Sequence, residues 1–306
     1  MSRVDYDSIA ILAAVVREGS FEAAAKSMNV SQSAVSQRIK QLEEKVGVVL
    51  VARGRPCLPT EAALHFCSHL DQVVLLQQEL AGRMRNLIGG EDAQAATIRI
   101  GVNNDSLATW FPSLIKRATQ ELGVRFDILP DDQEHTEGSL KSGDALAVIT
   151  TLEPPVQGCR RISLGSMDYI AVASPELLQR EFSKGVSLAT LHDSTCIAFD
   201  RKDTIQDQWM TQCFGGTVPV STHFVPSYEG YLACCLKGVG WGLVPRIAGA
   251  PYIKKGQLME LSAGQEVRVS LHWQASMQSS EILKRLGDMV LEEARLHLTP
   301  DRFRPD

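Results

Sequence analysis

The feature that most constrains this chain is a pair of helical segments separated by a tight turn close to the N-terminus. An alanine-rich helix capped by Ser20 is predicted over Phe21–Met28. A second helix is capped by Ser31, runs to about Val46 and is closed by Gly47. An amphipathic helix over Asp5–Arg17 precedes the pair. Three helices in this order, with only two residues for the turn, predict a helix-turn-helix.

The second helix of the pair carries hydroxyl, amide and guanidinium groups opposite its apolar stripe. Gln and Arg side chains form bidentate contacts with base edges, and Ser hydroxyls at a capped helix start bind phosphates. The apolar stretch Val48–Ala52 and the arginines after it predict a strand and a basic wing. We expect contacts with double-stranded DNA from Ser31, Gln32, Ser33, Ser36, Gln37, Arg38, Arg53 and Arg55. The alternative is that this polar face is only solvated.

Charge is unevenly distributed along the chain, which has a net charge of −5. Residues 1–60 carry eight of the 31 Lys and Arg and six of the 36 Asp and Glu, which leaves 23 bases and 30 acids for the other residues. A basic segment on an acidic body indicates a nucleic-acid-binding module joined to a different domain.

A long helix is predicted from Glu61 to about Asn86, with Thr60 as its cap. Its apolar residues recur at alternating spacings of three and four, the heptad pattern of a coiled coil. The predicted dimerisation seam consists of Phe66, Leu70, Val73, Gln77, Leu80 and Met84. A homodimer or homotetramer would place two DNA-reading modules about 34 Å apart, one helical turn of DNA. The alternative is a helix that packs only on its own domain.

Gly89-Gly90-Glu91-Asp92 is a polar, flexible break that we interpret as a domain boundary. After it, strands alternate with helices, which predicts an α/β fold with mostly parallel sheets. The predicted parts are a winged helix-turn-helix at 1–60, a linker helix and hinge at 61–90, and a two-lobed domain at 91–306. Lobe I is expected at about 97–165 and 268–298, and lobe II at about 166–267.

Signals for catalysis, cofactors and membranes are missing from the sequence. No nucleophile elbow, zinc-protease motif, P-loop or dinucleotide fingerprint is present, so we expect no enzyme and no cofactor. His65 and His69 lie four residues apart beside Cys67, but without further ligands they predict no metal site. The longest apolar run, Ile9–Val16, is too short for a membrane span and follows acidic residues, so we expect a cytoplasmic protein without a membrane partner.

The chain resembles the LysR-type transcriptional regulators over almost its whole length. The segment SQSAVSQRIKQLE, Ser31–Glu43, is similar to the recognition-helix signature of that family. Three segments further resemble the ArgP-type branch, also called chromosome-initiation inhibitors: NNDSLATW at Asn103–Trp110, AFD at Ala198–Asp200 and SYE at Ser227–Glu229. Regulators of that branch respond to lysine and arginine and control the export of basic amino acids. The resemblance therefore implies a DNA-binding regulator that senses such an amino acid.

In this family the effector domain is similar to periplasmic binding proteins, with the ligand between two lobes. A cationic amino acid needs donors for its carboxylate and acids for its cationic groups. Ser106 and Thr109 follow the first strand at a helix start, whose N–H groups favour a carboxylate. The acids nearest to predicted strand ends or helix starts are Asp105, Asp168, Asp200 and Glu229. For each acid the alternative is a helix cap or a surface charge.

Two further hypotheses remain open. A thiol-oxidation sensor would keep the DNA reader and use Cys196 and Cys213 as its redox pair, although no basic residues flank them to lower a thiol pKa. A solute-binding protein or an enzyme would use the N-terminal helices only to dimerise. The regulator hypothesis instead implies operator DNA, an amino-acid effector, a second copy of the chain and RNA polymerase as partners.

Overall fold

The structure is a computed structural model that describes residues 5–88, 97–130, 139–140, 145–151, 154–277 and 280–301. The chain divides into two compact units, which are treated separately. Unit 1 comprises Met1–Val102, Ile115–Ile162 and Trp273–Met289, and unit 2 comprises Asn103–Leu114, Ser163–His272 and Val290–Asp306. The break predicted at Gly89-Gly90-Glu91-Asp92 lies outside the described residues.

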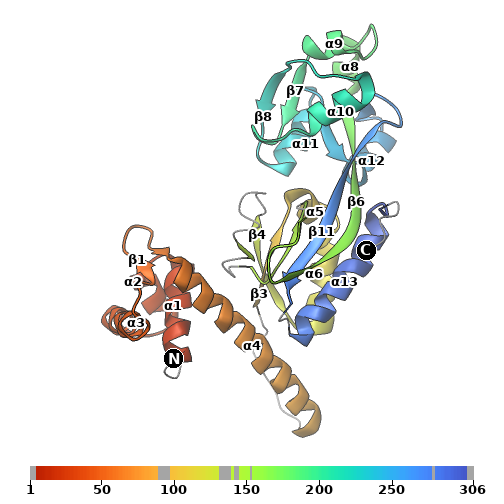
Figure 1. Cartoon of the computed structure of the whole chain (residues 1–306). Coiled ribbons are helices and arrows are strands. Elements are labelled where there is room, and N and C mark those ends of the chain that lie inside the picture. The colour runs from red at the N-terminus through yellow and green to blue at the C-terminus, as the bar shows by residue number, and fades with distance from the viewer. Residues whose placement is uncertain are drawn as a thin grey trace. The chain divides into compact units, whose positions relative to one another are not determined.

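The N-terminal part of unit 1 is the predicted winged helix-turn-helix (red to orange in Figure 1). Its elements are α1 (Tyr6–Glu18), α2 (Phe21–Ser27), α3 (Gln32–Val46), β1 (Val51–Ala52), β2 (Leu58–Pro59) and α4 (Glu61–Ile88). Ser20 and Ser31 cap α2 and α3, because their hydroxyls accept backbone N–H groups three residues on. Gly19 and Gly47 end α1 and α3 in the left-handed conformation that glycine adopts without strain.

The wing is shorter than predicted. The apolar stretch Val48–Ala52 suggested a full strand, but only Val51–Ala52 pairs, antiparallel with Leu58–Pro59. Val48 and Val49 are exposed, at 49% and 63%, and precede the strand. Apolar composition alone therefore overestimated the length of β1.

The three N-terminal helices share one hydrophobic core. Leu12, Val15, Ala24, Val35 and Ile39 are at most 2% exposed and form its centre. Ala63 at the start of α4 is fully buried in the same core, and Phe66 packs against it. The long helix therefore begins as part of the DNA-reading module.

The remaining chain alternates strands and helices, which confirms the predicted α/β class. Its strands are β3 (Thr97–Val102), β4 (Arg125–Pro130), β5 (Ala147–Thr150), β6 (Cys159–Ala173), β7 (Thr195–Ala198), β8 (Ser221–Phe224), β9 (Gly242–Pro245), β10 (Met259–Glu260) and β11 (Glu266–Ser276). Its helices are α5 (Asn104–Ala108), α6 (Phe111–Leu122), α8 (Pro175–Glu181), α9 (Leu188–His192), α10 (Ile205–Phe214), α11 (Tyr228–Leu236), α12 (Arg246–Lys254) and α13 (Glu281–His297).

Parallel and antiparallel pairings both occur in these sheets. In unit 1, β3 pairs in parallel with β4 and β5, and in unit 2, β7 pairs in parallel with β8. In unit 2, β6 pairs antiparallel with β9 and β10. Strands β6 and β11 each contribute residues to both units, so the chain runs through both along these two strands.

The core of unit 2 brings its helices and strands around Tyr231. The buried hydroxyl of Tyr231 donates to the carbonyl of Ile197 at 2.9 Å and accepts the N–H of Leu243 at 2.8 Å. The glycine-rich turn after α11 fits closely here, because a Cβ at Gly240 would lie 2.7 Å from the carbonyl oxygen of Thr195. Glycine at this position therefore allows close packing between the turn and β7.

Within the described part of the chain, no helix combines the length and the apolar content needed to cross a bilayer.

Candidate functional site

The polar face of α3 is open to solvent. Ser31, Gln32, Ser33, Gln37 and Arg38 are exposed and Ser36 is half-buried, whereas the opposite stripe lies in the core. The Ser31 hydroxyl accepts the N–H of Ala34 at 3.2 Å and lies 3.0 Å from the Ser33 hydroxyl. The residues predicted to read DNA therefore share one accessible helix face.

The two wing arginines are also accessible. Arg53 and Arg55 are exposed, on the loop between β1 and β2. The guanidinium carbon of Arg53 lies 5.8 Å from the centre of the Phe21 ring at the start of α2, within cation–π range. Arg53 is thus partly oriented by the module itself, while its charge remains available to a polyanion.

The predicted seam on α4 changes character along the helix. Phe66, Leu70 and Val73 are half-buried, and Phe66 packs on the core of the DNA-reading module. Gln77 and Leu80 are exposed, with Leu80 at 61%. The side chain of Met84 lies outside the described residues. The seam is therefore uncovered at Gln77 and Leu80.

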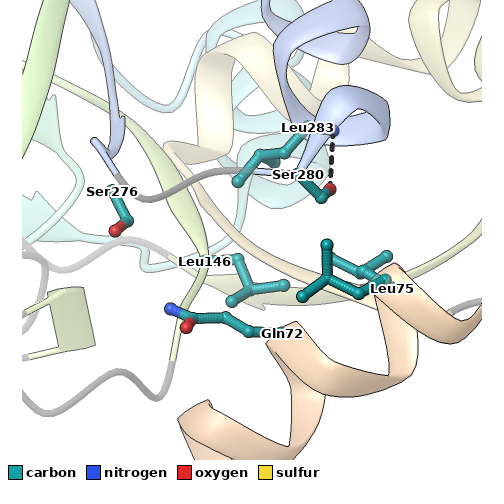
Figure 2. Close-up of a pocket in the computed structure, with 7 residues that line it drawn as sticks. Gln72, Leu75, Leu146, Ser276, Ser280 and Leu283 are labelled. Carbon is teal, nitrogen blue, oxygen red and sulfur yellow. Dashed lines mark hydrogen bonds between the residues drawn. The ribbon is translucent and has the colours of Figure 1, made fainter. Parts of the chain in front are cut away.

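A second apolar face of α4 borders a small cavity in unit 1. Leu75, 2% exposed, lines a space of about 210 Å³ together with Leu146 and Leu283 (Figure 2). Ser280 lies at the same place, where its hydroxyl accepts the N–H of Leu283 at 3.2 Å and so caps the start of α13. Leu75 lies outside the heptad seam, so α4 has separate faces for the seam and for the rest of unit 1.

Asp105 is a half-buried member of the predicted effector residues, and its carboxylate is bonded inside unit 2. Its carboxylate on α5 accepts the hydroxyl of Tyr169, from β6, at 2.5 Å. Burial raises the pKa of Asp105, and the negative charge of Asp203 raises it further, against the effect of the Tyr169 hydrogen bond. Burial, with the Asp105 charge in addition, raises the pKa of Tyr169 well above its usual range, so this tyrosine keeps its proton.

Asp203 was not among the acids selected from the sequence. Its carboxylate is half-buried and accepts the N–H groups of Phe199 and Ile205 and the amide of Gln206, at 3.1 to 3.2 Å. Asp200 was selected as an effector candidate because it directly follows a predicted strand. Asp203, three residues later, precedes α10, and its spacing before that helix was the signal that could have identified it.

Three polar atoms on the segment that contains Asp105 are buried and lack a hydrogen-bond partner among the described residues. They are Oδ1 of Asn103, Oγ of Ser106 and Nε1 of Trp110. Ser106 and Trp110 are completely buried. Buried polar atoms without partners are rare in proteins, and one common reason is a missing ligand or water. This segment therefore has unused acceptor and donor capacity next to a half-buried carboxylate.

The other predicted effector residues have local roles. The Thr109 hydroxyl donates to the carbonyl of Asp105 in its own helix at 2.5 Å. Asp200 is exposed and accepts the N–H groups of Lys202 and Asp203, which makes it the cap of a turn. Glu229 is exposed in the first turn of α11, where its carboxylate accepts the Ser227 hydroxyl at 3.3 Å.

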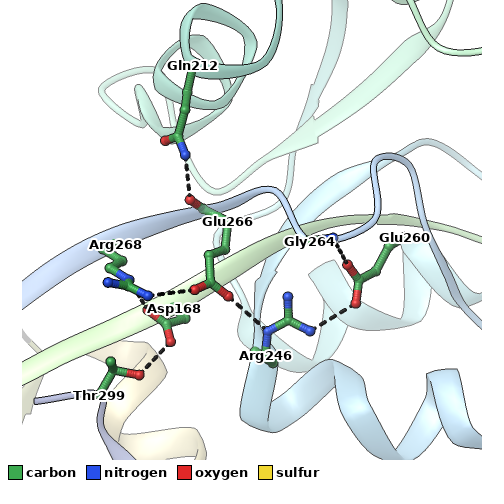
Figure 3. Close-up of polar contacts among 8 residues, drawn as sticks. All are labelled: Asp168, Gln212, Arg246, Glu260, Gly264, Glu266, Arg268 and Thr299. Carbon is green, nitrogen blue, oxygen red and sulfur yellow. Dashed lines mark hydrogen bonds and ion pairs between the residues drawn. The ribbon is translucent and has the colours of Figure 1, made fainter.

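Asp168 is already engaged by other residues of unit 2. Its carboxylate pairs with Arg268 at 3.2 Å and accepts the Thr299 hydroxyl at 2.5 Å (Figure 3). Arg268 also pairs with Glu266, which in turn pairs with Arg246, which pairs with Glu260. A carboxylate held in this alternating chain of charges stabilises the protein and is poorly suited to a ligand, so we leave Asp168 out of the effector site.

Burial of the two thiols argues against Cys196 and Cys213 as a redox pair. Burial raises the pKa of Cys196 well above its usual value and raises that of Cys213 as well. A peroxide-sensing cysteine needs the opposite, a lowered pKa and access to solvent. Among the described residues, no group of three or more His, Cys, Asp or Glu side chains is arranged to hold a metal ion.

Comparison with known families gives two matches that together span most of the chain. Residues 6–64 match the family described as bacterial regulatory helix-turn-helix protein, lysR family. Residues 91–295 match the family described as LysR substrate binding domain.

Individual relatives match over nearly the full length. The HTH-type transcriptional regulator LysG of Mycobacterium tuberculosis is 38% identical over 289 residues, which cover 94% of this chain and 93% of the relative. The crystal structure of ArgP from M. tuberculosis has a TM-score of 0.79 and 36% identity and covers 98% of this chain and 100% of its own. Full-length LysG from Corynebacterium glutamicum with bound effector Arg has a TM-score of 0.70 and 32% identity, with coverages of 97% and 100%.

The raised pKa of Asp105 predicts a pH-dependent stability. Because the folded state favours the neutral carboxyl, the resulting stabilisation is complete below the ordinary pKa of 3.8 and is lost as the pH rises through the raised value. Asp105→Asn, neutral at every pH and still able to accept from Tyr169, should raise the melting temperature of the ligand-free protein at pH 7. This gain should shrink as the pH is lowered towards 4.

Asp193→Asn is the control for this comparison, because it removes an exposed carboxyl of the same unit. It should leave the melting curve nearly unchanged at both pH values. A melting temperature of Asp105→Asn below that of the parent at pH 7 would contradict the burial cost assigned to Asp105.

Proposed function

Because the chain belongs to the LysR family of bacterial transcriptional regulators, we propose that it binds operator DNA as a homo-oligomer and responds to a basic amino acid, lysine or arginine. The effector would bind at α5 in unit 2. The regulated genes would be those for export or metabolism of that amino acid. Contact with RNA polymerase at the promoter would convert DNA binding into a change in transcription.

The observation that carries the choice of effector is the half-buried carboxylate of Asp105, whose pKa is raised by desolvation. It forms no ion pair with any described Lys or Arg, and the nearby charge that acts on it is another acid, Asp203. A buried charge without a countercharge is costly. The ammonium of lysine or the guanidinium of arginine would supply that countercharge, which gives these ligands an advantage over neutral amino acids.

The unpartnered atoms on the segment that contains Asp105 have the chemistry needed for the other end of an amino acid. Oδ1 of Asn103 can accept from an α-ammonium group, and Oγ of Ser106 and Nε1 of Trp110 can donate to an α-carboxylate. The bound Arg in the C. glutamicum LysG structure, a relative with 32% identity, supports the same ligand class. Asp200 and Glu229 lie on exposed turns, and we assign them secondary roles at most.

Oligomerisation would use the exposed part of the α4 seam. Leu80, 61% exposed, lies in a helix of 28 residues whose heptad spacing suits a second copy of itself. A dimer would present two α3 helices to the two halves of a palindrome-like operator, and a tetramer would extend the site. The effector changes DNA binding only to the extent that it binds one arrangement of these modules more tightly than another.

The DNA-contact assignment predicts two different mutant signatures. Arg53→Ala and Arg55→Ala should each weaken binding to operator and unrelated DNA alike and lower the salt slope by about 0.9, since each removes one phosphate contact. Gln32→Ala and Arg38→Ala should cost roughly 1–3 kcal/mol on the operator and reduce discrimination between sequences. Fluorescence anisotropy titrations at several salt concentrations measure both. Unchanged affinity and selectivity in the double variant Gln32→Ala with Arg38→Ala would refute the assignment of α3.

The effector assignment predicts a selective thermal shift. Among the twenty amino acids, lysine or arginine alone should raise the melting temperature, because a ligand at about 100 times its Kd stabilises the native state by about 2.7 kcal/mol. That corresponds to a rise of roughly 5–10 °C for a domain of 150–250 residues. Asp105→Asn should lose this response, whereas Asp193→Asn should keep it. A shift with neutral amino acids only would leave the DNA-binding function intact and remove the basic amino acid as effector.

The seam assignment predicts the effect of a charge in the middle of α4. Leu80→Glu should convert the oligomer to smaller species in sedimentation velocity runs, since it places like charges face to face in the two-helix interface. His65→Glu is the control, because it adds a charge at an exposed position of the same helix outside the seam, and it should leave the sedimentation coefficient unchanged. Equal effects of both substitutions on the sedimentation coefficient would contradict the assignment of the seam.

A further inference from the structure

Glu43 on α3 holds the backbone at the entrance of the wing. Its Oε1 accepts the N–H of Leu50 at 2.7 Å and the N–H of Val51 at 3.2 Å. Val51 opens β1, the first strand of the wing. A carboxylate that accepts two backbone N–H groups forms charge-assisted hydrogen bonds, which are stronger than those between neutral groups. The wing is thereby fixed to α3 at one point.

The segment of residues 49–51 is also held by Thr60, the residue that precedes α4. The hydroxyl of Thr60 donates to the carbonyls of Val49 and Leu50, at 2.9 and 3.1 Å. Its backbone N–H also donates to the Leu50 carbonyl at 2.9 Å. Leu50 itself is completely buried. The segment is therefore clamped between α3 through its N–H groups and the start of α4 through its carbonyls.

The wing needs this clamp because its own pairing is minimal. Only two residues of each strand pair, Val51 with Pro59 and Ala52 with Leu58. A two-stranded hairpin is marginally stable by itself in water. Besides this pairing, the Cys57 N–H donates to the Gly19 carbonyl at 2.8 Å on the returning side of the wing, so the contacts of Glu43 and Thr60 fix the strand that leads into Arg53.

We propose that Glu43 is a positioning residue for DNA binding, which keeps the wing arginines in register with the base-reading face of α3. It would touch no DNA itself. This role extends the DNA-binding function of the family and does not depend on which effector the protein binds.

Electrostatics alone predicts that removal of Glu43 strengthens DNA binding, whereas a positioning role predicts that it weakens binding. A carboxylate on a helix that faces a polyanion repels it, so removing one acid from α3 should strengthen binding. Glu44, the next residue, is exposed and pairs only loosely with Lys40, at 3.7 Å. Glu43→Ala and Glu44→Ala remove the same charge from the same helix, so the long-range electrostatic effect is matched between them.

The experiment measures affinity for operator and for unrelated DNA as a function of salt, with full-length parent and variants. Glu44→Ala should bind as the parent does or slightly tighter, with an unchanged salt slope. Glu43→Ala should bind both DNAs roughly five- to fifty-fold more weakly, with a slope lower by up to about 1.8, the value for two lost phosphate contacts. The ratio of operator to unrelated affinity should persist, because Gln32 and Arg38 stay on an intact α3. Glu43→Gln, which retains one acceptor oxygen, should recover part of the loss.

A second substitution separates positioning from a general loss of folding. Adding Arg53→Ala and Arg55→Ala to Glu43→Ala should have little further effect, whereas the same changes in the parent should be costly. If Glu43→Ala fails to fold, as judged by its circular dichroism spectrum, Thr60→Val decides. It removes the hydroxyl contacts to Val49 and Leu50 together with the cap on Ala63, so its own spectrum must match that of the parent, and it should then lower the salt slope in the same way. Equal behaviour of the Glu43 and Glu44 variants, or lost base discrimination at an unchanged slope, would overturn the proposal.

Discussion

The hydrogen bond from Tyr169 to Asp105 is the interaction around which the proposed effector site is organised. It joins α5, which directly follows the first strand of the α/β part, to β6, one of the two strands that run through both units. A neutral hydroxyl satisfies one lone pair of the carboxylate but does not neutralise its charge. The charge of Asp105 therefore has no countercharge among the described residues, and a cationic ligand would supply one.

The N-terminal module could be predicted almost completely from the sequence because its determinants are local. Ser20 and Ser31 cap helices, Gly19 and Gly47 end them, and the apolar stripe of α3 appears in four consecutive turns. The clamp on Leu50 could not be predicted in the same way. Glu43 reads as an ordinary solvent-facing acid of a polar helix, and only the tertiary path of the wing brings two backbone N–H groups to it.

In the α/β part the class was predictable and the site only in part. Proximity to a strand end or helix start selected Asp105 and Ser106, but it also selected Asp168 and Asp200. The contacts that distinguish these acids come from residues far away in the sequence. Asp168 pairs with Arg268 of β11, a hundred residues later, whereas Asp105 accepts the hydroxyl of Tyr169 and lies near the charge of Asp203. Short helices such as α5, α9 and α12 carry too little hydrophobic periodicity to be distinguished from turns in the sequence.

The helix α4 explains how a change elsewhere in unit 1 could reach the DNA. At about 1.5 Å per residue, its 28 residues form a rod of roughly 42 Å. Ala63 lies in the core of the DNA-reading module, Leu75 packs beside Leu146 and Leu283, and Leu80 remains exposed. One continuous helix therefore connects the contact at Leu75 with the DNA-reading module. Thr60, which precedes α4, holds the carbonyls of Val49 and Leu50, and Glu43 holds the N–H groups of Leu50 and Val51. The start of α4 is thus linked directly to the wing and to the recognition helix.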